Sequence, residues 1–197
     1  MLWHCGRHGA RVSGPVLGEL VAAFRVYKRL GERALEQVND RDFVRVLDED
    51  SNSLAILVQH MAGNLRSRFT DFLVTDGEKP DRNRDLEFEL SPETSRVELI
   101  QRWEAGWEAL FGALEPLRAE DLDLIVLIRG QRQTVLKAIV RQLSHHAYHV
   151  GQIVQLSRHW AGPEWKTLSI PRGGSEAFNA EMAVRFAEPV TSQSPPV

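Results

Sequence analysis

The sequence predicts an all-α fold in which four long amphipathic helices share one hydrophobic core. The main observation is that apolar residues recur every three or four positions, as on one face of a helix. They do so over residues 17–38, 54–72, 92–115 and 135–160. Residue types that start or stop helices bound these segments. The length of 197 residues and the hydrophobic content of 43% are sufficient for one domain with a sizeable core.

The spacing of apolar residues indicates the first two helices, and capping residues also mark where the second begins. In residues 17–38 the apolar residues recur at helical spacing and charged residues lie between them, which predicts a helix with one buried face. The second helix follows Ser51, Asn52 and Ser53, residue types that cap helix N-termini. Its predicted core stripe comprises Leu54, Leu57, Val58, Met61, Leu65, Phe69 and Phe72.

A long polar segment, residues 75–85, separates the second helix from the third. Loops of this length in compact domains are often functional, and this one allows a long crossover between the two helices. The third helix is predicted to open at residues 91–94 and to end before Pro116. Its expected core stripe comprises Val97, Ile100, Trp103, Trp107, Leu110, Phe111 and Leu114.

The fourth helix is predicted over residues 135–160, after a short connection. Within residues 122–134 an apolar run meets a glycine-containing turn, which predicts an extended or hairpin-like segment. A short amphipathic segment is expected over residues 176–186.

The predicted domain organisation has three parts. Residues 1–16 form a flexible leader, residues 17–188 form the helical domain with a C-terminal extension, and residues 189–197 form a disordered tail. In the leader, His4, Cys5 and His8 could bind a metal, but nothing there would fix their geometry, so a disordered terminus is the preferred interpretation.

Composition excludes several classes of function. The chain has 24 basic and 27 acidic residues, well mixed, and a net charge of -3, which argues against a nucleic-acid partner. Its single cysteine cannot form an intrachain disulfide, and the first residues lack the apolar segment of a secretory signal, so none is expected. No run approaches the ~18 apolar residues that span a bilayer. We therefore expect a cytoplasmic protein without a membrane partner.

Three histidines form the strongest candidate site. His145 and His149 lie four residues apart in the fourth helix and so share one face. His60 is the only histidine in another strongly helical segment, and a third imidazole from a neighbouring helix would complete a three-histidine set with an open position, as in catalytic zinc sites. His146 could pair with His149 instead, but the i, i+3 geometry is less favourable and a supporting or packing role is expected. Taken singly, a buried histidine is more often a hydrogen-bonded structural residue.

The histidine set, with Val-Gly-Gln after His149, resembles the DinB/YfiT-like superfamily of bacterial four-helix-bundle metalloproteins. The resemblance covers residues 17–161 and is closest to the subgroup carrying the sequences TDGEKP and NRD, here residues 75–80 and 83–85. It implies a four-helix bundle, commonly a homodimer, with a divalent Zn or Ni ion held by His60, His145 and His149.

The resemblance also implies a class of reaction. Some relatives are thiol-dependent transferases or isomerases, in which a low-molecular-weight thiol such as bacillithiol or mycothiol is activated on the metal and attacks a small-molecule substrate. The expected function is therefore a metal-dependent enzyme, a thiol S-transferase or hydrolase, that activates a thiol or water. The nucleophile must be external, because Cys5 lies in the leader and the sequence indicates no catalytic side chain.

Two alternatives stay open. The chain could be a non-catalytic dimeric bundle with a structural or regulatory metal, because fold does not fix function. It could also be a metal-free helical interaction module.

Three further features bear on the substrate. Arg82 and Arg84, and residues 172–175, could bind a carboxylate or phosphate through guanidinium or backbone N–H groups. A solvated loop and an ordinary helix cap are the preferred interpretations. Trp103 and Trp107 could line a pocket, but packing in the core is expected.

Overall fold

The computed structural model describes residues 14–187. Within them the chain is mostly helical, in agreement with the all-α class, and has one small antiparallel sheet. The elements are α1 (Pro15–Leu35), α2 (Asp40–Phe43), α3 (Leu54–Phe69), η1 (Asp85–Phe88), α4 (Arg96–Leu114), η2 (Ala119–Asp123), β1 (Ile125–Ile128), β2 (Gln131–Thr134), α5 (Val135–Ala161), η3 (Gly162–Glu164) and α6 (Ser175–Arg185). The predicted tail and residues 1–13 of the predicted leader, with the less favoured metal site at His4, Cys5 and His8, lie outside the described residues.

The described chain divides into two compact units, one up to residue 165 and one from residue 166 onward. The second unit contains α6, the short helix expected over residues 176–186. No residue of α6 is buried. Between residues 14 and 187, no helix combines the length and the hydropathy needed to cross a bilayer.

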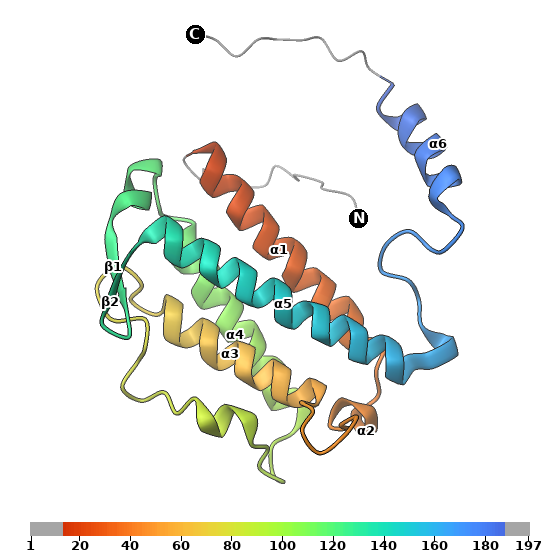
Figure 1. Cartoon of the computed structure of the whole chain (residues 1–197), viewed down its shortest axis with the longest axis horizontal. Helices are drawn as coiled ribbons and strands as arrows, with labels where there is room; N and C mark the ends of the chain where they lie inside the picture. The colour runs from red at the N-terminus through yellow and green to blue at the C-terminus, as the bar shows by residue number, and fades with distance from the viewer. Residues whose placement is uncertain (1–13, 188–197) are drawn as a thin grey trace. The chain divides into compact units, whose positions relative to one another are not determined.

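The four long helices of the first unit pack side by side (Figure 1). α3 packs against α4, α1 packs against α5, and α3 also contacts α5. α3 and α5 run in opposite directions, as the colour gradient along each helix shows in Figure 1. The segment between α3 and α4 passes along α3, and its η1 turn contacts that helix. This crossover and the α3–α5 contact together position the candidate site.

Side-chain caps explain where three of the four helices begin. The Ser53 hydroxyl accepts a hydrogen bond from the Ile56 amide, as the predicted start of this helix requires. Thr134 caps α5 in the same way. The predicted start of the third helix was wrong: residues 91–94 form a turn, and α4 begins at Arg96 with Ser95 as its cap. Ser95 is a cap residue too, but Ser91-Pro92 gave an equally good signal earlier in the chain.

The core is largely the predicted one, although Ile100 and Phe111 of the predicted stripe are only half-buried. Trp103 and Trp107 are fully buried and contact each other edge-to-face, so they are core residues. Val97 is 67% exposed, because the buried face of α4 follows Leu99 and Trp103 instead. Phe72 is buried against Phe69, but it lies beyond the end of α3.

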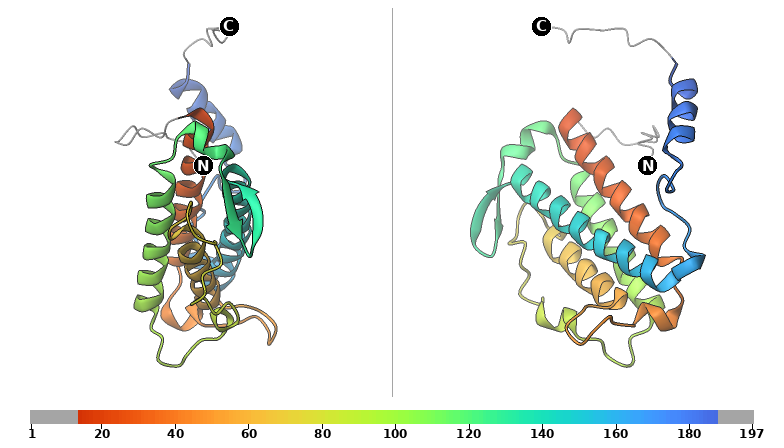
Figure 2. Two further views of the ribbon diagram at one scale, coloured as in Figure 1. Left: turned by 90° about the vertical axis from the view of Figure 1, so that its left-hand side faces the viewer. Right: turned by 45° about the vertical axis from the view of Figure 1, so that its right-hand side comes forward.

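The predicted hairpin is present and lies where α5 begins (Figure 2). β1 and β2 pair in antiparallel register with Ile128 opposite Gln131, which leaves a two-residue turn. Arg129 and Gly130 both have positive φ, 56° and 72°, as the tightest hairpin turns require.

Candidate metal site

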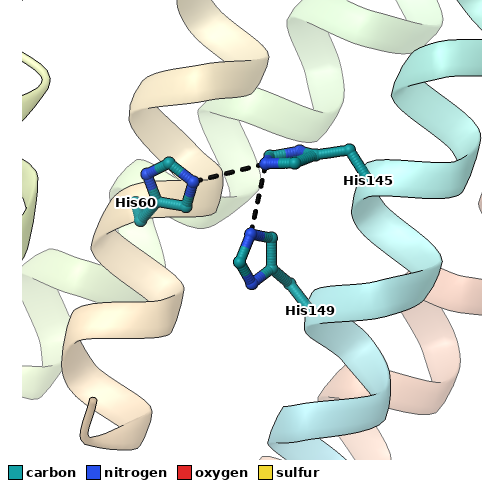
Figure 3. Close-up of side chains that lie close together, drawn as sticks. All are labelled: His60, His145 and His149. Carbon is teal, nitrogen blue, oxygen red and sulfur yellow. Dashed lines mark hydrogen bonds between the residues drawn. The ribbon is translucent and has the colours of Figure 1, made fainter. Parts of the chain in front are cut away.

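The candidate metal site lies between α3 and α5. Because the two helices are antiparallel neighbours, His60 on α3 faces the turn of α5 that carries His145 and His149. The Nε2 atom of His145 lies 3.3 Å from that of His60 and 3.1 Å from that of His149 (Figure 3). The potential ligand atoms of all three lie within 4.8 Å of one another. The structure therefore brings together the three residues that the sequence singled out.

In two of the three rings, Nδ1 makes a hydrogen bond that fixes the orientation of the imidazole. The Nδ1 atom of His60 lies 2.8 Å from Oε2 of Glu87, and that of His149 lies 2.7 Å from Oε1 of Gln152. These oxygens can only accept, so each Nδ1 donates its proton and each neutral ring keeps a lone pair on Nε2. Metal-binding histidines in proteins are commonly held by such acceptors.

A cation fits this arrangement better than a hydrogen-bond network does. The lone pairs of His60 and His149 both face Nε2 of His145, which carries at most one proton and cannot satisfy both contacts well. Nitrogen ligands at about 2.0–2.1 Å from a tetrahedral zinc ion are ~3.3 Å apart. The two short separations, 3.1 and 3.3 Å, are close to that value. The residues can therefore hold a metal ion.

Burial keeps the imidazoles in the form that binds metals. Burial, followed by the electrostatic effect of His146 and His149, lowers the pKa of His145 to about 2. Burial also lowers the pKa of His149, although its hydrogen bond to Gln152 opposes the shift. Both rings are therefore neutral at pH 7, and no proton has to be displaced there when a metal binds.

A buried ion pair supports His60. The guanidinium of Arg82 donates to both carboxylate oxygens of Glu87, from Nε at 2.7 Å and from Nη2 at 2.9 Å. Burial raises the pKa of Glu87, but the hydrogen bonds from His60 and Arg82 outweigh it and hold the pKa below its usual range. Glu87 is thus an ionised carboxylate fixed on one side by Arg82 and presented to His60 on the other.

Gly63 makes room for this carboxylate. A Cβ atom at position 63 would lie 2.3 Å from Oε1 of Glu87, far inside van der Waals contact. Gly63 lies three residues after His60 on α3, so the same helix that carries the imidazole also provides the gap for its carboxylate partner. Any larger residue at position 63 would displace Glu87.

The crossover is held in place by further charged contacts. The carboxylate of Asp76 accepts from the backbone amides of Arg129 and Gly130 at 2.8 and 2.7 Å, which fastens the crossover to the hairpin turn. Glu78 accepts from Arg68 at 3.0 Å and from Arg129 at 2.9 Å. The TDGEKP sequence therefore anchors the segment that delivers Arg82 and Glu87.

Two arginines of the crossover have different surroundings. The Arg82 side chain is 5% exposed and fully engaged with acidic partners, so the prediction of a solvated or anion-binding Arg82 was wrong. The Arg84 side chain is half exposed and lies over the Phe88 ring. Residues 172–175 belong to the other compact unit, where α6 begins at Ser175 after Gly174 and has no side-chain cap, so the preferred interpretation as an ordinary serine cap was wrong. Their suggested anion site stays a prediction.

His146 has a packing role, as expected. It is fully buried, its Nδ1 donates to the Gln142 carbonyl at 2.7 Å, and its ring contacts Phe24 and Trp107 edge-on. Burial lowers its pKa to about 4, although the hydrogen bond to Gln142 opposes this shift.

Sequence reasoning missed the supporting residues Glu87, Gly63 and Gln152. Gln152 could have been found, because it follows His149 by three helical positions and can therefore reach its ring. Glu87 and Arg82 could not, because they lie on a crossover whose path depends on tertiary contacts.

Comparison with known proteins identifies a family but no activity. A family model described as "Protein of unknown function (DUF1572)" matches residues 11–174. That span contains His60, His145 and His149 together with the whole crossover. No curated protein and no solved structure matches the chain.

Proposed function

The chain belongs to the DUF1572 family, and from its site we propose that it is a metal-dependent enzyme of the DinB/YfiT-like class. In this proposal the four long helices form a DinB-like four-helix bundle. His60, His145 and His149 hold one divalent ion, Zn or Ni, both of which accept imidazole ligands. The enzyme acts on a small-molecule substrate, in the cytoplasm, as a homodimer.

One observation carries the proposal. Three imidazole nitrogens converge, and hydrogen bonds at Nδ1 fix the orientation of two of the rings. A histidine that only packs needs one hydrogen-bond partner, as His146 has with Gln142. The Glu87 carboxylate at His60 and the Gln152 amide oxygen at His149 instead fix Nδ1 as the donor. Both Nε2 atoms are therefore free to bind a metal.

When bound, the ion would stay doubly positive with an open position, and would lower the pKa of a coordinated water or thiol to form a nucleophile near neutral pH. The thiol would be an external one, such as bacillithiol or mycothiol, used in an S-transferase reaction, and water would be used in a hydrolase reaction. Among the protein's residues, Glu87 keeps the Nδ1 proton on His60, and Gln152 does the same for His149. Phe88 lies 4.8 Å from the His60 ring, centroid to centroid, and limits access of water on that side.

A structural or regulatory metal is the second candidate. It is favoured by the position of the site, because ligands from α3 and α5 would join two helices that are neighbours in space but distant in sequence. In this case metal would stabilise the fold, and no thiol or electrophile would bind.

The first experiment is elemental analysis of the tag-free, full-length protein. Wild type is compared with His145→Ala/His149→Ala, and with the control His159→Ala, an exposed histidine in the last turn of α5. We expect about one metal ion per chain in wild type and control, and none in the double variant. Equal metal content in all three proteins would overturn the site.

The second experiment separates the two functions. Metal-loaded protein is assayed for thiol transfer to small electrophiles and for hydrolysis. Turnover that disappears in the double variant supports the enzyme. A metal-dependent rise in melting temperature without turnover or thiol binding supports the structural metal.

A further inference from the structure

We propose that a groove between α3, α4 and the crossover is a second ligand site, which takes a small organic anion with an apolar body. The groove has a volume of about 530 Å³, within the range of small-molecule pockets. None of the three site histidines lines it, but Gly63, Arg82 and Glu87, which support His60, do, so the groove adjoins the candidate metal site.

The floor of the groove is built from small residues. Ala62 and Gly63 come from α3, and Ala105 and Gly106 come from α4. At Gly106 a Cβ atom would lie 3.1 Å from Cβ of Leu65 and 3.2 Å from the carbonyl oxygen of Ala62, so the two helices approach closely there. At Gly63 the space is taken by the Glu87 carboxylate, so Ala62 and Ala105 provide the apolar surface of the floor.

The wall of the groove carries several basic side chains. Its lining contains Arg66, Lys79, Arg82 and Arg102 but only two acidic residues, in a chain whose net charge is -3. Both acidic residues are already paired, Asp81 with Arg66 and Glu87 with Arg82.

Two of the cations can still donate hydrogen bonds to a ligand at the groove. The Lys79 ammonium donates to the Thr75 hydroxyl and the Asp76 carbonyl, both neutral oxygens at 2.6 Å. Arg102 pairs with Glu98 through Nη2, and because its side chain is half exposed, its other N–H groups can donate to a ligand. A ligand carboxylate can therefore form charge-assisted hydrogen bonds at the wall. An apolar body on the small-residue floor would add burial, which an inorganic anion cannot provide.

The test uses 2-naphthoate, which has an apolar body and one carboxylate, titrated into the metal-loaded full chain. Backbone amide shifts of the ¹⁵N-labelled protein are followed by NMR, with neutral 2-naphthamide as the matched ligand. We expect saturable shifts at residues 62–66 and 102–106, and weaker binding of the amide. Arg102→Gln should weaken naphthoate binding by about tenfold.

Two further variants make the test specific. Ala105→Phe fills the groove from an exposed position and should abolish the shifts. Arg118→Gln removes an exposed arginine that does not line the groove and should leave binding unchanged. Absent or non-saturable shifts at these residues, equal binding of the amide, or equal binding by the Arg102→Gln or Ala105→Phe protein would each overturn the proposal.

Discussion

Replacing Glu87 with glutamine tests whether the residues behind His60 support a metal site. The amide oxygen can still accept the Nδ1 proton of His60, but the negative charge is lost. That oxygen can also accept from Nη2 of Arg82, but the bond from Nε is lost, and Glu78, at 3.4 Å, is then the carboxylate that still contacts Arg82. The change therefore removes charge and leaves the shape almost intact.

The expected loss of metal affinity follows from burial. The side chains of His60 and Glu87 are 4% and 9% exposed, so solvent screens their interaction weakly. Changes to such supporting partners cost about 10–100-fold in metal affinity, or ~1.4–2.7 kcal/mol. We expect the upper part of that range. The metal-free variant should also lose about 3 kcal/mol of stability, because the buried Arg82 guanidinium loses its main counter-charge.

The assay is a zinc titration in competition with a chromophoric chelator, with urea unfolding of the metal-free protein as the second measurement. Asp85→Asn is the control, because its side chain is 94% exposed and lies only two residues away. An affinity for zinc within twofold of wild type, in a variant whose circular dichroism shows it to be folded, would refute the role given to Glu87.

Three other predictions address the same fold. Gly63→Ala should weaken zinc binding by about tenfold or more, because its Cβ would displace Glu87, whereas Gly112→Ala meets no atom within 4 Å and should leave zinc binding unchanged; equal affinities would contradict the steric argument. Arg96→Met should destabilise the protein to urea by about 2–3 kcal/mol, since its guanidinium donates to the carbonyls of Val38 and Leu35 at or just after the end of α1, at 2.6 and 2.8 Å, and an unchanged urea midpoint would count against this role. The metal-free protein should lose stability as the pH falls from about 6.5 towards about 4, because burial lowers the pKa of His146 to about 4 and the unfolded chain then binds the proton more readily; a flat melting temperature over that range would contradict it.

The sequence predicted those parts of the molecule that depend on local spacing. The i, i+4 relation of His145 and His149 follows from helix geometry alone, and the cap at Ser53 from side-chain chemistry. The hairpin was predicted because its turn contains Gly130. That His60 would face the pair was an expectation about helix packing, and the structure brings the three together.

The features that the sequence did not predict depend on contacts between residues that are distant in sequence. Arg82 reads as a solvated residue in a polar loop, and only the tertiary position of Glu87 explains its burial. The start of α4 was misplaced because Ser91 and Ser95 are equally good caps locally, and burial of Leu99 and Trp103 favours the later one. Propensity could not choose between them.

The separation of the candidate ligands along the chain has a consequence for how the protein is made. His60 precedes His145 by 85 residues, so during synthesis the first imidazole emerges long before its partners. The site is complete only after α5 has docked on α3. The same helix also packs against α1, so α1 has no long partner on that face until α5 is in place. Metal capture would therefore report that the last long helix is in place, and a ribosome-bound chain that stops before residue 145 would have one of the three imidazoles and no site to fill.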